Sequence, residues 1–206
     1  MSDLVLVGRS SSHYTRVARI FALELGVAHV FRPVLDMMSL DAATYSGNPA
    51  LKVPVLVDED GLLVGTENIC RVLALRSGKR SSVVLRGDVT ARIVMNAEEM
   101  ALHVMATEVA VIMAKMGGDD RAVPPKVQRS LENALGFLNE NIDRALAALP
   151  AERTLSFLEV ALFSTLTHLP WRQVMDVAAY ERLAAFCARF GERAGARETE
   201  YRFDAA

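Results

Sequence analysis

The sequence predicts a small α/β domain over residues 1–78, a linker at 79–87 and an all-helical domain over 88–206. In the first part, short apolar runs, which are typical of strands, alternate with segments whose apolar residues have the spacing of a helix face. A polar break at 77–82 follows. Beyond it, long segments keep a helical spacing, which indicates helices packed on helices.

The first half of the α/β domain reads as strand, helix, strand. The apolar run Asp3–Val7 predicts a strand, and Tyr14–Leu25 has apolar residues on one helical face. Gly26 is a helix stop signal. His29–Val34 predicts the second strand, parallel to the first because a helix connects them.

The second half reads as strand, turn, strand, helix. Val53–Val57 and Leu62–Val64 flank an Asp-Gly turn, which is a hairpin signal. A helical pattern follows, with Thr66 as the predicted N-cap. Pro54 cannot donate to a strand ladder, so it is expected at a strand start, an edge or a bulge, in cis or trans. The two halves together predict a mixed sheet covered by helices.

Three long segments are predicted to be helical after the linker. They are Asp88–Met116, which has no internal Gly or Pro, then Lys126–Leu149, and later Val177–Gly191. Gly117–Pro125 predicts a loop between the first two, and Ala194–Ala206 predicts an irregular tail.

One helix start is marked by a capping box. Ser156 is the expected N-cap and Glu159 is the expected N3 partner. Leu155 and Val160 are spaced to form a hydrophobic staple across the same turn. This pattern predicts a role in folding.

Composition restricts the class of protein. The chain has 206 residues, a net charge of −2, 51% hydrophobic and 23% charged residues, all ordinary for a globular protein. We expect no nucleic-acid or membrane partner, and no signal segment or membrane span is evident. Cys70 and Cys187 form no motif, which favours a cytoplasmic protein. The four histidines lack zinc-type spacing, so no metal is expected.

The stretch NPALKVPVLVDEDGLLVGTENI resembles the second half of the thioredoxin-like domain of cytosolic glutathione transferases. The Ser156 box also resembles a hallmark of that family's C-terminal domain, with Glu159 where Asp is usual. The likeness extends over nearly the whole chain and is closest to the serine-type, bacterial-like enzymes. It implies the glutathione transferase fold, a thioredoxin-like domain followed by an all-α domain, with a cis peptide before Pro54.

The predicted chemistry lies where the first strand meets the first helix. A helix N-terminus favours a thiolate, and a hydroxyl there can donate a hydrogen bond to sulfur. The resemblance places the catalytic residue at Ser12, followed by His13 where many members have Pro. Ser10, Ser11 and Tyr14 remain alternative donors. Ser12 as a helix cap alone is an equally good interpretation.

The resemblance also implies a glutathione site. The backbone of Val53 would pair with the cysteinyl moiety, while Glu67 and Asn68 would hold the γ-glutamyl group. The usual Ser is replaced by Asn68. The predicted glutathione-binding residues are Ser12, Lys52, Val53, Pro54, Glu67 and Asn68.

The implied reaction is addition of the glutathione thiolate to a small electrophile. Glutathione is then a co-substrate, and a second, apolar substrate site is shaped by the helical domain. The family further implies a homodimer in which 88–116 contributes to the contact. Two other functions stay open: a non-catalytic scaffold with this fold, and a glutathione-dependent reductase or isomerase.

Overall fold

The computed structural model describes residues 4–116 and 123–205. The loop predicted at Gly117–Pro125 lies largely outside these residues. The described residues divide into two compact units, one formed by 4–83 with 193–205 and the other by 84–192. The first transition falls within the expected linker. The C-terminal end differs from the expectation, because it belongs to the first unit.

The first unit contains the predicted mixed sheet. Its strand order is β2-β1-β3-β4, with β1 parallel to β2 and antiparallel to β3, and with β3 antiparallel to β4. The strands are β1 (Val5–Gly8), β2 (Val30–Pro33), β3 (Val55–Asp58) and β4 (Gly61–Val64). The β3–β4 hairpin forms where predicted, with Glu59 and Asp60 in the turn between the paired residues Asp58 and Gly61.

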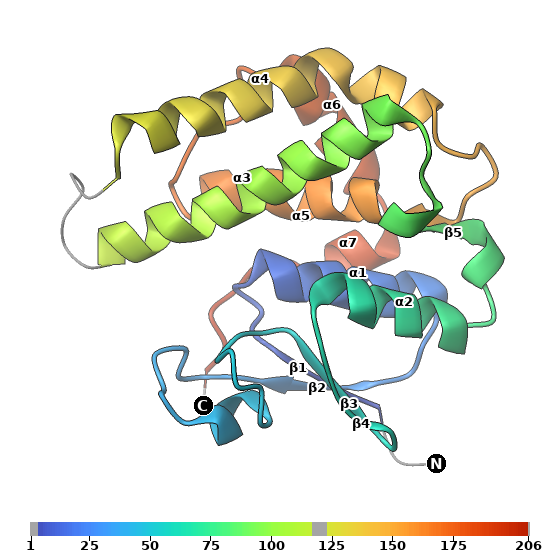
Figure 1. Ribbon diagram of the computed structural model, residues 1–206, viewed down its shortest axis with the longest axis vertical. Coiled ribbons are helices and arrows are strands. Elements are labelled where there is room, and N and C mark those ends of the chain that lie inside the picture. The colour runs from blue at the N-terminus through green and yellow to red at the C-terminus, as the bar shows by residue number, and fades with distance from the viewer. Residues whose placement is uncertain (1–3, 117–122, 206) are drawn as a thin grey trace. The chain divides into compact units, whose positions relative to one another are not determined.

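Two helices cover one face of this sheet. Figure 1 shows α1 (His13–Leu25) and α2 (Thr66–Arg76) side by side above the strands. Gly26 ends α1 in the left-handed conformation, as its position predicts. The N-cap prediction for α2 was wrong by one residue. Gly65 is the N-cap, because Thr66 already has helical geometry and Gly65 takes the positive φ of 93°.

The opposite face of the sheet has its own apolar core. Val7 and Val55 lie on this face with Val34 and Tyr45. Because side chains alternate along a strand, Leu6 and Leu56 point to the helical face instead. Tyr45 comes from the short 3₁₀ helix η1 (Ala42–Tyr45), which the sequence did not predict. An element of this length has no apolar periodicity to detect.

The C-terminal segment is more ordered than predicted. No helix was expected there, yet the five-residue helix α7 (Ala194–Glu198) forms and contacts α1 within the first unit. Its Gly195 and Ala196 are buried. The prediction of an irregular tail at Ala194–Ala206 is therefore wrong at its start. The sequence of this segment is polar and shows no apolar helix face, because the segment is held by polar contacts to α1.

The second unit is built mainly from helices, as predicted. The two longest, α3 (Arg92–Met116) and α4 (Pro125–Ala147), pack against each other. The expected start of α3 at Asp88 is four residues too early. The Asp88 carboxylate accepts the N–H of Leu85 at 2.9 Å and closes the 3₁₀ turn η3 (Arg86–Asp88) instead. Short elements precede these helices at η2 (Arg80–Ser82) and β5 (Val83–Val84).

The remaining helices of this unit are α5 (Phe157–Trp171), preceded by β6 (Leu155–Ser156), and α6 (Glu181–Phe190). Helix α6 begins at Glu181, four residues after the start predicted at Val177. Asn139 of α4 supplies the reason, because its Oδ1 accepts the N–H groups of Arg182 and Leu183 at 3.0 and 3.3 Å. Those bonds satisfy backbone donors of the first turn of α6.

Ser156 is confirmed as the N-cap of α5, so the N-cap half of the predicted capping box is present. Ser156 Oγ accepts the N–H of Glu159 at 3.2 Å and donates to Glu159 Oε2 at 2.6 Å. Arg153 donates to both carboxylate oxygens of Glu159, at 2.8 and 2.7 Å. Leu155 and Val160 are both buried, as a staple requires.

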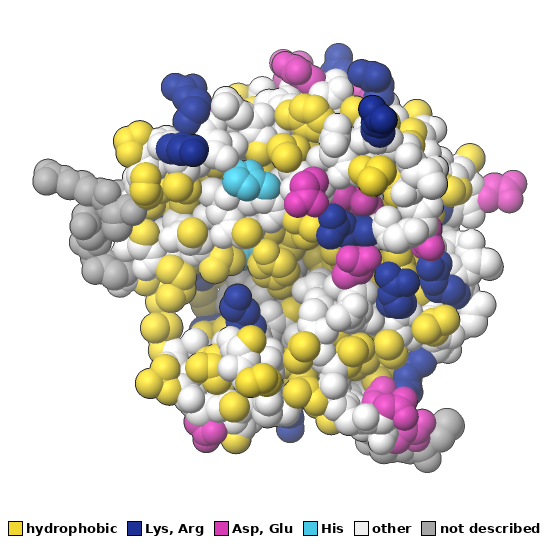
Figure 2. Space-filling model, viewed as in Figure 1, with side chains coloured by type: hydrophobic (Ala, Val, Ile, Leu, Met, Phe, Trp, Pro, Cys, Tyr) yellow, Lys and Arg dark blue, Asp and Glu magenta, His cyan; other side chains and the backbone are white. Residues whose placement is uncertain are grey.

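Charged side chains of both signs are interspersed on the face drawn in Figure 2. That distribution agrees with the small net charge of −2. Among the described helices, none combines the length and apolar character needed to cross a membrane.

Candidate glutathione site

Ser12 is the N-cap of α1. Its backbone is extended, and its Oγ accepts the N–H of Thr15 at 3.2 Å. The side chain is half-buried, and the first turn of α1 has no acidic residue. An N–H···O bond uses only the oxygen as acceptor, so the Ser12 hydroxyl hydrogen can still be donated. The cap role and a thiol-contacting role are thus compatible in one residue.

The junction between β1 and α1 is close-packed around Thr15. A Cβ at Gly8 would lie 2.3 Å from Thr15 Cγ2, so only glycine fits at the end of β1. The N–H of Arg9 donates to Thr15 Oγ1 at 3.3 Å. These contacts fix the first turn of α1 against the strand, and they place the loop of Ser10, Ser11 and Ser12 at the helix N-terminus.

The alternative donors have different surroundings. Ser10 is buried; its Oγ accepts from Arg19 Nη1 at 3.3 Å and its N–H donates to Asp204 Oδ2 at 2.7 Å. Ser11 is also buried. Tyr14 is half-buried and its ring lies 4.6 Å from the ring of His13. Ser12 is therefore the most exposed of the three serines.

The start of α2 holds two predicted glutathione residues. Glu67 lies in the first turn and pairs with Arg71 at 3.6 Å. Asn68 Nδ2 donates to the carbonyl of Val64 at 3.0 Å, which directs its amide back toward β4. N–H groups in the first turn of a helix offer a site for a carboxylate.

The predicted strand-side residues lie just before β3. The Val53–Pro54 peptide bond is cis, Pro54 is buried and Val53 is half-buried. The Lys52 side chain is exposed, while its carbonyl accepts from Asn48 Nδ2 at 2.8 Å. All six predicted glutathione-binding residues belong to the first unit.

Cys70 is unsuited to thiol chemistry. It is fully buried in α2, and burial, with a smaller contribution from Glu67, raises the pKa of its thiol well above the usual range. A thiol kept protonated is a poor nucleophile. Cys70 is a packing residue.

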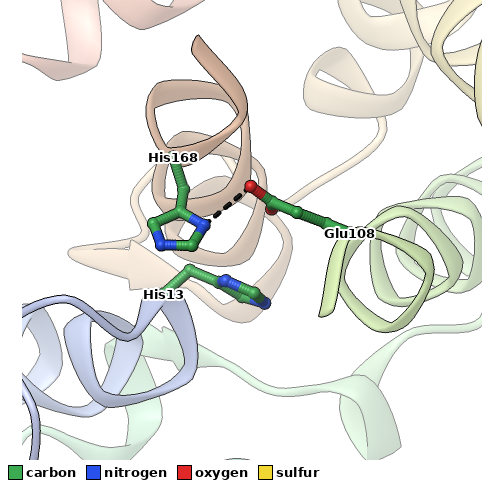
Figure 3. A group of neighbouring side chains, drawn as sticks. All are labelled: His13, Glu108 and His168. Atoms are coloured by element: carbon green, nitrogen blue, oxygen red, sulfur yellow. Dashed lines mark hydrogen bonds and ion pairs between the residues drawn. The ribbon is translucent and has the colours of Figure 1, made fainter. Parts of the chain in front are cut away.

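The second unit contains a buried polar pair that the sequence did not predict. Figure 3 shows the hydrogen bond between His168 Nδ1 of α5 and Glu108 Oε1 of α3, which is 2.7 Å long. Thr165 donates to the other carboxylate oxygen at 3.2 Å. Burial raises the pKa of Glu108, and the bonds from His168 and Thr165 partly offset that effect. The two residues are sixty positions apart in the sequence, so no local sequence pattern predicts that they pair.

The second unit also has a cavity of about 420 Å³ between α3 and α4. Met100, His103 and Phe137 contribute to its lining, with Lys126, Arg129, Ser130, Asn133 and Ala134. His103 Nε2 and Ser130 Oγ are 2.6 Å apart across it.

Comparison with known proteins agrees with this fold. Residues 6–81 match the family model described as glutathione S-transferase, N-terminal domain. No curated protein matches the chain in sequence.

Solved structures match over nearly the whole chain. A glutathione S-transferase from Methylobacillus flagellatus with glutathione bound is 25% identical, with a TM-score of 0.79 over 97% of this chain and 100% of that one. One from Methylobacterium radiotolerans, in complex with glutathione sulfonate, is 17% identical with a TM-score of 0.72 over 99% and 98%.

A glutathione transferase family member from Pseudomonas fluorescens Pf-5 with bound glutathione is 18% identical, with a TM-score of 0.73 over 97% of this chain and 100% of that one. At such identities the two lower matches establish the fold alone. Together with the family match over 6–81, they show that this chain has a glutathione S-transferase N-terminal domain and the fold of the cytosolic glutathione transferase family.

Proposed function

We propose that this protein binds glutathione in its first unit and adds the glutathione thiolate to a small electrophile. The observation that carries the proposal is the geometry of Ser12, a half-buried hydroxyl that caps α1 and keeps a hydrogen to donate. The solved relatives from Methylobacillus and Pseudomonas contain glutathione on the same fold, which supports glutathione as the co-substrate.

In this proposal Ser12 Oγ donates its hydrogen bond to the glutathione sulfur. The positive end of α1 and the hydroxyl both favour the thiolate, so the pKa of the bound thiol falls and its proton passes to water. The thiolate then attacks the electrophilic carbon. A C–S bond forms, and either a leaving group departs with the electron pair or the adduct takes a proton from water.

The rest of the first unit binds glutathione. The backbone of Val53 pairs with the cysteinyl moiety in an extended, strand-like manner. The N–H groups at the start of α2 receive the γ-glutamyl carboxylate, and Glu67 pairs with the ammonium. Pro54 fixes the backbone next to Val53, and Lys52 faces the glycyl carboxylate.

Asn68 favours a second candidate function. Its amide donates one hydrogen to the carbonyl of Val64, which leaves only the second hydrogen and the amide oxygen for a ligand. A scaffold that has this fold without turning over glutathione needs no ligand contact at this position. A scaffold need not bind glutathione, whereas a transferase must.

Titration calorimetry of glutathione into the wild-type chain decides between them. The transferase proposal predicts binding with a Kd in the millimolar range or tighter, weakened by Glu67→Gln, which removes the charge that pairs with the ammonium. Glu99→Gln is the matched control and leaves binding unchanged, because Glu99 is an exposed residue of α3 that pairs with Arg86. No heat of binding at millimolar glutathione would overturn the transferase proposal in favour of the scaffold.

The family fold also favours a homodimer. Met95, Val109 and Met113 are exposed apolar residues on α3, the helix expected at the contact. Light scattering after gel filtration tests this proposal, with a dimer mass expected and a monomer mass contradicting it.

A further inference from the structure

The C-terminal residues 193–204, here named the C-terminal clasp, run along α1 and end at the serine loop, residues 10–12. All of these residues belong to the first unit. The clasp begins near the last turn of α1, where Glu24 accepts from Arg193 Nε at 2.9 Å and from the N–H of Gly195 at 2.8 Å.

Arg16 fastens the middle of the clasp. This buried side chain donates from Nε to Thr199 Oγ1 at 3.2 Å and from Nη2 to the carbonyl of Ala196 at 2.9 Å. Its guanidinium also lies 4.4 Å from the centre of the Tyr201 ring, in a cation–π contact. A buried charge with these partners is held in one position.

Asp204 ends the clasp at the serine loop. Its carboxylate accepts the N–H of Ser10 at 2.7 Å, a short charge-assisted bond. Arg19 donates to Ser10 Oγ at 3.3 Å, and its guanidinium stacks on Phe31, 4.5 Å from the ring centre. Ser10 is thus held through its backbone by the clasp and through its side chain by α1.

We propose that Asp204 is a positioning residue, which fixes the serine loop in the conformation that presents Ser12 to the glutathione thiol. The proposal rests on the proposed function, since the loop is useful only if Ser12 meets a thiol. Ser10 is two residues from Ser12, and a hydroxyl displaced by even a fraction of an ångström loses hydrogen-bond energy. The Ser10–Asp204 bond joins residues 194 positions apart, so the two ends of the chain close one site.

Asp204→Ala and Asp204→Asn separate the hydrogen bond from the charge. The amide oxygen of Asn still accepts the Ser10 N–H, whereas Ala has no acceptor. Asp176→Ala is the matched control, because Asp176 accepts the N–H of Ala178 at 2.9 Å at an exposed turn of the second unit.

The first measurement is hydrogen–deuterium exchange of the ligand-free protein over residues 9–13. We expect exchange at Ser10 to become at least ten-fold faster in Asp204→Ala and to stay near the wild-type rate in Asp204→Asn and Asp176→Ala. Equal rates in all four proteins would overturn the proposal.

The second measurement is glutathione binding with the pKa of the bound thiol. We expect about five- to ten-fold weaker binding and a higher thiol pKa in Asp204→Ala, with rescue in Asp204→Asn. Faster loop exchange without a change in binding or thiol pKa would reduce the clasp to a structural contact and overturn the positioning role. If the wild-type chain binds no glutathione, the proposed function fails, while the exchange rates still decide whether Asp204 holds the loop.

Discussion

Ser12 and Ser156 are both N-cap serines, yet their surroundings differ. Ser156 is 1% exposed, and Glu159 takes up both its acceptor and its donor capacity. Ser12 is half-buried and caps α1 by accepting the N–H of Thr15 at its Oγ, and the first turn of α1 has no acidic residue. A cap serine that donates its hydrogen to an N3 carboxylate has a structural role, whereas a cap serine without such a carboxylate keeps that hydrogen for a ligand.

We expect the largest effect from Ser12→Ala, which should lower the rate of the transferase reaction. Loss of a hydrogen-bond donor to a developing or resting anion costs about 100-fold in rate. We expect this decrease in kcat/KM for glutathione with a reactive electrophile such as a chlorodinitrobenzene. A rate within two-fold of wild type would assign the donor to Ser10, Ser11 or Tyr14 and leave Ser12 as a cap only.

Ser156→Ala has the largest expected effect on stability. It removes a buried cap and leaves Glu159 with one fewer partner, so we expect a loss of about 2 kcal/mol in the free energy of unfolding. Urea denaturation measures it. Ser12→Ala should lose about 1 kcal/mol or less, because its cap is partly solvated. Equal losses at the two sites would contradict the distinction between them.

Glu159→Gln is a smaller change at the same Ser156–Glu159 cap of α5. The variant keeps an oxygen that can accept from Ser156 but loses the charge that Arg153 binds with two hydrogen bonds. Since both side chains are only 15% and 17% exposed, we expect a loss of about 1 kcal/mol, measured by the same urea titration. Glutathione binding should not change, because this box lies in the second unit.

The smallest effect is expected from the buried carboxylate of Glu108. Because burial raises its folded pKa above the unfolded value, the native state keeps the proton to higher pH, and this group's contribution to stability falls as pH rises through that interval. Glu108→Gln cannot titrate. The stability of the variant relative to wild type should therefore rise from pH 4 to pH 6.5 in urea titrations. A relative stability that falls over this range would reverse the sign of the assigned pKa change.

The fold was largely predictable, because its signals are local. The Asp-Gly hairpin signal, Gly26 as a helix stop and the Ser156 N-cap each act within a few residues, and each element formed where it was expected. Helix starts were less predictable. Those of α3 and α6 depend on side chains outside the apolar pattern, Asp88 and Asn139.

The candidate site was predictable only in part. The position of Ser12 at the start of α1 follows from the sequence, because a helix face and its cap are local features. The partners of the serine loop do not. Arg16 and Arg19 belong to a residue type that is seldom fully buried, yet both are buried, and Asp204 lies far away in the sequence. Contacts that span nearly the whole sequence leave no trace in periodicity or spacing.

The role of Ser12 is tested most directly by the thiolate absorbance of bound glutathione against pH, compared in wild type, Ser12→Ala and Ser156→Ala. We expect a bound-thiol pKa below that of free glutathione in wild type and Ser156→Ala, and a return toward the free value in Ser12→Ala. An equally depressed pKa in all three proteins would contradict this role, because the hydroxyl of Ser12 would then not stabilise the thiolate.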